Sequence, residues 1–201
     1  MLREIRPAII ILVLLTLITG LAYPLAMTAI AGAIFPKQAR GSLVERNGEV
    51  VGSALIGQEF KDDKYFHGRP SATTAPDPAD ATKTVSAPYN AANSGGSNLG
   101  PTSRVLIERL TADRKILDQA EPELAGKPIP ADMLTTSASG LDPEISLAYA
   151  ALQVRRVAAA RGVTEEQISA VLARHIAGRT LGILGEPWVN VLELNLDLQN
   201  H

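Results

Sequence analysis

The amino-terminal part of the chain contains a long uncharged segment. From Pro7 to Pro36 no residue is charged, and most are Ile, Leu, Val or Ala. A transmembrane helix needs roughly 20 such residues to cross the hydrocarbon core of a bilayer. We therefore predict a single membrane-spanning helix here. The chain then divides into residues 1–36, a short basic tail with the anchor, and residues 37–201, one extramembrane domain.

A cleaved secretory signal is the alternative interpretation of this segment. The apolar region of such a signal is shorter, about 7–15 residues, and ends at small residues of the form Ala-x-Ala. Ala29-Ile30-Ala31 has that form. The length of the segment favours a retained anchor over a cleaved signal.

Basic residues on the two sides of the segment bear on its orientation. Arg3 and Arg6 precede it, whereas Lys37 and Arg40 follow it and weaken the bias. Basic flanks tend to stay in the cytoplasm. Because the tail before the apolar run is very short, we predict a cytoplasmic amino terminus and an extracytoplasmic domain.

Local signals after the anchor predict a mixture of strands and helices. Asn47-Gly48 lies between two β-prone runs and predicts a type I′ hairpin. A helix is expected to begin near Thr102 or Ser103, with an apolar face of Leu106, Leu110 and Leu117.

Four further elements are predicted in the carboxy-terminal half. Residues 133–139 suggest a short buried strand, and Asp142 with Pro143 suggests the start of a helix that ends at Gly162. Residues 164–167, Thr-Glu-Glu-Gln, form a capping box for another helix. Alternating leucines within residues 188–198 predict a half-buried strand.

Residues 71–100 are rich in Gly, Ser, Ala and Pro, and their only large apolar residues are Val85, Tyr89 and Leu99. Such a segment cannot form a core of its own, and we expect a long loop. With the elements above, this composition predicts the fold class α+β: one anchor followed by one compact domain that carries a long loop.

Composition excludes several classes of function. The net charge is −2, so a nucleic-acid partner has no electrostatic support, and the absence of cysteine excludes disulfides and thiolate metal sites. The three histidines lie in separate segments, so no metal site is predicted, although Asp62, Asp63 and His67 could converge on a cation. Arg156, on a helical stripe, is expected to extend its head to solvent.

The glycine-rich stretch at residues 93–101, NSGGSNLGP, raises the question of phosphate binding. It lacks the Lys and the spacing of a P-loop, and it lacks the G-x-G-x-x-G pattern. A structural turn is the favoured interpretation, and nucleotide binding is the alternative. No hydrolase motif and no catalytic set is recognised in the chain.

Five blocks, in order, resemble the C-subunit family (KdpC) of the bacterial potassium-transporting Kdp ATPases. They are GSALIGQ at 52–58, YFHGRPSAT at 65–73, SGGSNL at 94–99, SASGLDP at 137–143 and VNVLELN at 189–195. The resemblance implies a bacterial inner-membrane complex. Its partners are a potassium-conducting A subunit, an ATP-hydrolysing B subunit and a small stabilising subunit. It also implies a non-catalytic subunit of a high-affinity potassium-uptake complex, which assists assembly and acts as a catalytic chaperone that raises the ATP affinity of the B subunit.

The resemblance carries over no catalytic residue and no bound cofactor, since ATP and potassium are handled mainly by other subunits. Within its blocks, the candidate partner or nucleotide contacts are Gln58, His67, Arg69, Ser94, Gly95, Gly96, Asn98 and Asp142. With the domain outside the cytoplasm, these residues could not touch ATP directly. A secreted or tethered binding module unrelated to ATP is the alternative function.

Overall fold

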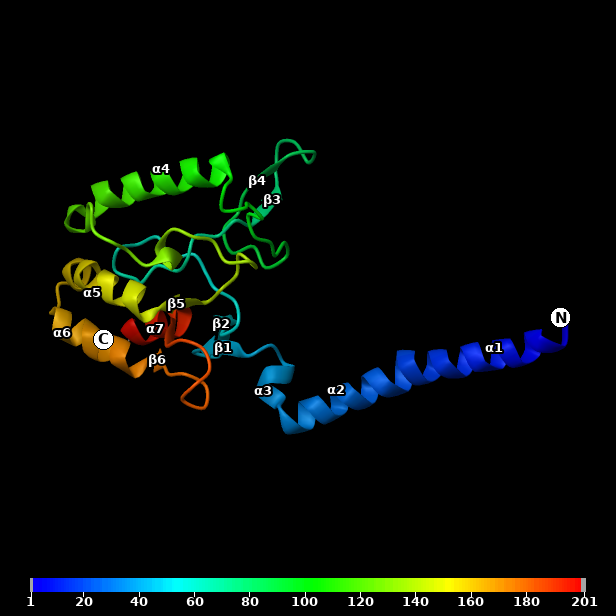
Figure 1. The fold of residues 1–201 in the computed structure, drawn as a ribbon. Coiled ribbons are helices and arrows are strands. Elements are labelled where there is room, and N and C mark those ends of the chain that lie inside the picture. The colour runs from blue at the N-terminus through cyan, green and yellow to red at the C-terminus, as the bar shows by residue number, and fades with distance from the viewer. Residues whose placement is uncertain (1, 200–201) are drawn as a thin grey trace. The chain divides into compact units, whose positions relative to one another are not determined.

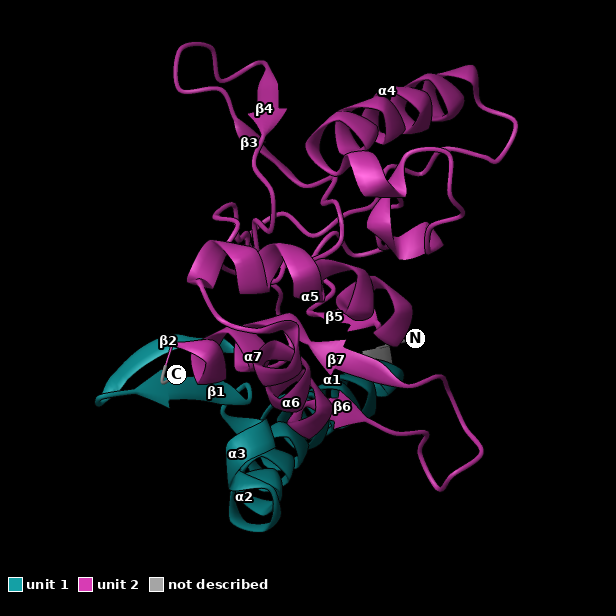
Figure 2. Ribbon diagram, turned by 90° about the vertical axis from the view of Figure 1, so that its left-hand side faces the viewer, with its two compact units in different colours: residues 1–53 teal, residues 54–201 magenta. Residues whose placement is uncertain are grey.

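The computed structural model describes residues 2–199 (Figure 1). The chain forms two compact units, residues 1–53 and residues 54–201, which Figure 2 shows in different colours. The predicted fold class is confirmed, because an apolar amino-terminal helix is followed by a mixture of helices and strands.

The first unit begins with a nearly continuous helix. It comprises α1 (Leu2–Leu17), a π-helical turn η1 (Ile18–Ala22) and α2 (Tyr23–Ile34). Within this turn, the Thr19 hydroxyl donates to the Leu15 carbonyl at 2.7 Å. Such a bond from a Thr side chain to the carbonyl four residues earlier often bends a helix. The 32 residues Arg3–Ile34 are long and apolar enough to make a candidate membrane span.

A short helix and a hairpin complete the first unit. They are α3 (Pro36–Ala39), β1 (Leu43–Arg46) and β2 (Glu49–Ser53), and the strands pair antiparallel. Asn47 and Gly48 both have positive φ angles, as a type I′ turn requires. The predicted hairpin is therefore confirmed.

The core of the second unit combines a small sheet with three helices. β5 (Glu144–Ser146), β7 (Trp188–Asn190) and β6 (Ile176–Ala177) pair antiparallel in the order β5-β7-β6. The helices are α5 (Leu147–Arg161), α6 (Glu165–Arg174) and α7 (Val191–Leu198). Completely or almost completely buried apolar side chains fill the space between them: Phe66, Ile145, Val157, Val189, Leu194 and Leu198.

The predicted ends of two helices are confirmed. Gly162 ends α5 with a positive φ in the left-handed region, which glycine adopts without steric cost. At the start of α6, the Thr164 side chain accepts from the Gln167 amide, and the Gln167 side chain accepts from the Thr164 amide. Both termini were predictable because every partner lies within a few residues.

The predicted start of α5 at Asp142 is wrong. Strand β5 intervenes, and the helix begins after Ser146, whose hydroxyl accepts from the Tyr149 amide at 3.1 Å. The Asp132 carboxylate in turn accepts from the Ser146 amide at 2.7 Å and from its hydroxyl at 3.1 Å. A carboxylate distant in sequence therefore helps to fix this helix start.

The predicted strand at 188–198 is correct only up to Asn190. Its side chain accepts from the Glu193 amide at 3.1 Å and so caps α7. Helix α7 buries Val191, Leu194, Asn195 and Leu198, which share one helical face. The polar Asn195 on this face made the helical pattern look like an alternating one.

The remaining elements surround the core. They are the paired strands β3 (Thr74–Pro76) and β4 (Thr84–Ser86), helix α4 (Arg104–Ala120), and the 3₁₀ turns η2 (Pro122–Leu124) and η3 (Ala131–Met133). Helix α4 follows Ser103, one of the two predicted caps, but the Ser103 side chain forms no capping bond. The strand predicted at 133–139 is wrong: only η3 and an extended loop occur there. The loop 71–100 contains the β3–β4 hairpin.

Candidate functional site

Four of the five blocks that carry the resemblance meet at one place in the second unit. We call it the motif junction: segments 57–58, 69–73, 87–96 and 135–142. The Gly57 amide donates to the Leu141 carbonyl at 2.8 Å. The Ser139 carbonyl accepts from the Gly95 amide at 2.8 Å and from the Ser94 hydroxyl at 3.0 Å. Loops far apart in sequence are thus joined through their backbones.

The glycines of the junction allow these loops to approach closely. A Cβ atom on Gly96 would lie 2.9 Å from the Ala138 carbonyl oxygen, and one on Gly140 would lie 2.6 Å from the Gly95 carbonyl oxygen. The glycine-rich stretch therefore packs against a loop of its own chain. Because the Gly95 amide already donates to Ser139, the stretch is a structural turn rather than an open phosphate cradle.

Arg69 and Asp142 form an ion pair within the junction. The Nη1–Oδ2 distance is 2.8 Å, and the two side chains are 24% and 28% exposed. The Arg69 guanidinium also donates to the Thr136 carbonyl at 3.2 Å and, at 3.4 Å, to that of Thr135. One planar side chain with several donors therefore holds the 135–142 loop in place.

Tyr89 is a central residue that the candidate set missed. Its hydroxyl donates to the Arg69 carbonyl at 2.7 Å. Its ring occupies the space that a Cβ atom on Gly57 would need, and its hydroxyl the space that one on Gly68 would need. Burial raises the pKa of Tyr89 to about 12, so the hydroxyl stays protonated as a donor. The sequence offered one sign of its importance, because Tyr89 is one of the few large apolar residues in the 71–100 loop.

Ser71 was missed as well. Its hydroxyl donates to the Gly140 carbonyl at 2.7 Å and accepts from the Tyr89 amide at 3.0 Å. Its position in the block 65–73 was the available signal, but serine is common in polar loops and was not singled out there. Its contacts join three of the four junction segments.

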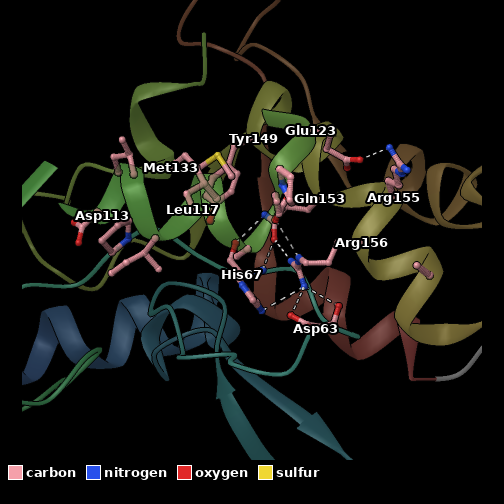
Figure 3. A pocket seen from close by; sticks show the side chains of 17 residues that line it. Asp63, His67, Asp113, Leu117, Glu123, Met133, Tyr149, Gln153, Arg155 and Arg156 are labelled. Carbon is pink, nitrogen blue, oxygen red and sulfur yellow. Dashed lines mark hydrogen bonds and ion pairs between the residues drawn. The ribbon is translucent and has the colours of Figure 1, made fainter. Parts of the chain in front are cut away.

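A second group of polar contacts fixes the segment that includes His67. Gln153, only 1% exposed, accepts from the His67 amide at 2.7 Å and donates to the His67 carbonyl at 3.0 Å. Arg156 donates to the Asp63 carbonyl at 2.7 Å and to the Gln153 side chain at 2.6 Å (Figure 3). The expectation that Arg156 extends into solvent is wrong, since its side chain is 15% exposed and bonds to backbone and Gln153.

The surroundings of His67 hold its pKa below the ordinary value of histidine. Burial is the larger cause that lowers its pKa, and the charge of Arg156 lowers it further. Its Nε2 lies 3.3 Å from the Asp62 carbonyl oxygen. Within residues 2–199, no group of three or more His, Asp or Glu side chains is arranged to hold a metal ion, so the alternative of a cation at Asp62, Asp63 and His67 finds no support.

These contacts border a cleft of about 770 Å³ that lies between α4 and α5 (Figure 3). Its charged lining consists of four carboxylates and two guanidinium groups: Asp63, Asp113, Glu121, Glu123, Arg155 and Arg156. Arg155 pairs with Glu123, and Arg156 lies 3.5 Å from Glu121. Because the cations are already paired and carboxylates outnumber them, the cleft is unsuited to a nucleotide phosphate.

The candidate contact residues separate into groups. Arg69, Asp142, Ser94, Gly95 and Gly96 lie together in the motif junction. Gln58, half-buried beside Gly57, also belongs to the junction, whereas His67 borders the cleft and Asn98 is exposed with a positive φ. That any of them contacts a partner or a nucleotide remains a prediction.

Glu144, at the edge of the junction, is expected to make the stability of the domain depend on pH. Burial, reinforced by a hydrogen bond and the negative charge of Asp142, raises the pKa of Glu144 to about 7. The folded state then binds a proton more tightly than the unfolded state. This stabilisation is complete below pH 4.5, the ordinary value, and is lost as pH rises through about 7.

We expect Glu144→Gln to remove part of this pH dependence. Thermal unfolding of the full chain in mild detergent, followed by Trp188 fluorescence, is compared at pH 5 and pH 8. The wild type should lose stability relative to the variant at pH 8. Equal pH dependence in the two proteins would contradict the assignment to Glu144.

The fold and these contacts define a class of protein: a small α+β domain whose loops are fastened to each other, joined to an apolar helix that is long enough to span a bilayer. Residues 5–200 match the family model of KdpC, described as the c chain of the K⁺-transporting ATPase. The chain belongs to this family, as the resemblance predicted.

Individual relatives agree with this assignment. A protein of Bradyrhizobium diazoefficiens named potassium-transporting ATPase KdpC subunit is 66% identical over 98% of this chain and 97% of its own length. Proteins with the same name from Rhodopseudomonas palustris and Methylorubrum extorquens are 63% and 60% identical; each alignment covers 98% of this chain, and 98% and 97% of the respective relative.

Proposed function

We propose that this protein is the non-catalytic C subunit of an ATP-driven potassium-uptake complex. The observation that carries the proposal is the family match over almost the whole chain, with relatives at 60–66% identity that are named as the same ATPase subunit. The geometry of the motif junction agrees with a non-catalytic role, because polar side chains of the junction bond to backbone groups and to each other.

The proposed partners are a potassium-conducting subunit, an ATP-hydrolysing subunit and a small stabilising subunit. We assign this chain to a bacterial inner membrane, with residues 3–34 as its single span and the folded domain outside the cytoplasm. Arg3 and Arg6, at the amino-terminal end of this helix, support this orientation.

The proposed role is that of a chaperone for catalysis: the bound chain raises the affinity of the ATP-hydrolysing subunit for ATP. A domain outside the cytoplasm acts on a cytoplasmic nucleotide site only by changing the populations of conformations of its partners. The closed packing of the glycine-rich stretch supports this indirect route over direct contact with ATP.

Co-purification tests the assignment. The full chain is co-expressed with the potassium-conducting and ATP-hydrolysing subunits, and the complex is isolated in mild detergent through a tag on the latter. We expect the chain in stoichiometric amounts. Its absence from an otherwise assembled complex would refute the proposal.

Two further measurements separate the alternatives. A mature protein that starts near residue 32, by mass spectrometry, would favour a secreted module over an anchored subunit. Protease access to the domain in cells with a permeabilised outer membrane tests the orientation. A domain that is protected until the inner membrane is lysed would contradict the extracytoplasmic placement.

A further inference from the structure

Helices α5 and α6 border a groove with an unusual distribution of charge. Its volume is about 500 Å³, which lies within the range of small-molecule sites. Its lining carries three cations and no carboxylate: Lys64, Arg161 and Arg174. The cleft between α4 and α5 and a third, smaller cleft both include carboxylates, so charge separates this groove from them. We call it the basic groove.

Aliphatic side chains make up most of the remaining lining of the basic groove. They are Ala160, Val163, Ile168, Ala170, Val171 and Leu198. Ile168, Val171 and Leu198 also belong to the hydrophobic core and are at most 6% exposed, whereas Val163 is 37% exposed. The groove therefore places an apolar surface, built on the ordered core, next to its cations.

Arg161 is the cation of the basic groove that has no carboxylate partner within residues 2–199. Its Nε donates to the Lys64 carbonyl at 2.8 Å, and its Nη1 donates to the Leu198 carbonyl at 2.6 Å. Its Cζ lies 5.7 Å from the centroid of the Tyr65 ring. These contacts fix the guanidinium group without neutralising it, and they leave the Nη2 donors available. Such a group is suited to bind a phosphate.

Lys64 places a second cation beside the same aromatic ring. Its Nζ lies 5.3 Å from the Tyr65 centroid and 2.9 Å from the Asp62 carboxylate. Asp62 lies outside the lining of the groove, and the two paired side chains are 54% and 47% exposed. An ion pair this exposed contributes little free energy, so Lys64 remains able to turn toward an anion in the groove.

The neutral polar side chains of the lining are already engaged. The Tyr65 hydroxyl accepts from the Gln199 side chain at 3.0 Å, and the Gln167 side chain accepts from the Thr164 amide at 3.0 Å. A bound peptide would bring backbone groups that need hydrogen-bond partners. An acyl chain brings none, so this lining favours a lipid over an acidic peptide.

We propose that the basic groove binds one anionic membrane phospholipid. The phosphate contacts the guanidinium of Arg161 and the ammonium of Lys64, and one acyl chain lies along the aliphatic lining. The same chain carries a helix long enough to span a bilayer, which keeps the domain near a membrane that supplies such lipids. This inference goes beyond the proposed function and depends on the anchor, not on the other subunits.

Quenching by brominated lipid tests the proposal on the full chain. Trp188 is the only tryptophan, so Tyr65→Trp with Trp188→Phe places a single fluorophore in the groove and keeps an aromatic ring there. The chain is reconstituted in phosphatidylcholine nanodiscs that contain a minor fraction of lipid with brominated acyl chains. We expect at least twofold stronger quenching by brominated phosphatidylglycerol than by the same amount of brominated phosphatidylcholine.

A reporter outside the groove controls for general attraction of the domain to an anionic bilayer. Ile107→Trp with Trp188→Phe places the fluorophore on α4, at a site that is 53% exposed and outside the groove. The two brominated lipids should quench this reporter equally. Equal quenching of the groove reporter by the two lipids, or the same preference at both reporters, would overturn the proposal.

A pair of substitutions on α6 provides a second test that removes no hydrogen bond. Ala170→Glu places a carboxylate in the groove, where it repels an anion and pairs with Arg161, and it should abolish the preference for phosphatidylglycerol. Ala173→Glu is the matched control, because Ala173 is an exposed alanine of the same helix outside the lining. This control should retain the preference. Equal effects of the two substitutions would contradict a site in the basic groove.

Two other occupants of the groove are outcomes of the same measurement. Stronger quenching by a brominated free fatty acid than by brominated phosphatidylglycerol would assign the groove to a different ligand. Loss of the phosphatidylglycerol effect in the assembled complex would show that a protein surface covers the groove. Either result would contradict the proposal. The isolated chain suffices for the main test, so failure of co-purification would refute the proposed function and leave this inference standing.

Discussion

Replacement of Gly96 by alanine is expected to destabilise the domain by about 2 kcal/mol, because a side chain there overpacks a closed contact. The added Cβ atom would lie 2.9 Å from the Ala138 carbonyl oxygen and 3.1 Å from that of Ser137. Both neighbours are backbone atoms, so the conflict can be relieved only by moving one loop away from the other. The Gly95 amide bond to Ser139 would be disturbed by the same movement.

Gly95→Ala is the matched control, since a Cβ atom on Gly95 meets no atom within 4 Å. Chemical unfolding of the full chain in mild detergent, followed by Trp188 fluorescence, measures both variants. We expect the control to change the free energy of unfolding by no more than about 0.5 kcal/mol. Equal effects of the two substitutions would show that the motif junction is not packed as described.

Replacement of Asn195 by alanine is expected to cost about 3 kcal/mol, because alanine would leave two buried backbone groups without partners, at about 1–3 kcal/mol each. Asn195 is completely buried and bonds to both backbone groups of Phe66: its Oδ1 accepts from the amide and its Nδ2 donates to the carbonyl, each at 2.8 Å. The cavity left by the amide adds to the loss.

The same unfolding measurement checks this expectation, with Gln119→Ala on the exposed surface of α4 as the control. The control should lie within about 0.5 kcal/mol of the wild type. The Asn195 variant should also release the segment around Phe66, seen as faster amide exchange at residues 65–67. A change below about 1 kcal/mol, with exchange at those residues unaltered, would contradict the assigned role of Asn195.

The parts of the fold that the sequence predicted correctly depend on near neighbours. The hairpin turn at Asn47-Gly48, the capping box from Thr164 to Gln167 and the end of α5 at Gly162 each involve residues at most a few positions apart. The apolar helix needs no tertiary partner at all, since its length and composition are sufficient. Each of these features is determined by residues within one short stretch of the sequence.

The errors occurred where the cause lies far away in the chain. Asn195 sits on the buried face of α7 because it bonds to Phe66, 129 residues earlier. Arg156 is partly buried because carbonyl groups some 90 residues earlier accept from it. The alternation of polar and apolar residues suggested a strand around Asn195, and the charge of Arg156 suggested a guanidinium group exposed to solvent. The distant bonding partners of these two residues could not be identified from local patterns.

The candidate site, like the fold, was only partly predictable from the sequence. The family resemblance selected Arg69, Asp142 and the glycine pair 95–96, and the structure brings these together in the motif junction. It selected neither Tyr89 nor Ser71, whose bonds connect the same loops.

We propose that this chain takes no part in hydrolysis and raises the affinity of its partner for ATP. The most direct test is the ATP concentration at half-maximal potassium-stimulated hydrolysis, measured on the purified complex with and without this chain. We expect a clearly lower half-saturating concentration when the chain is present, with hydrolysis abolished only by changes in the partner. The same half-saturating concentration in both preparations would contradict the account.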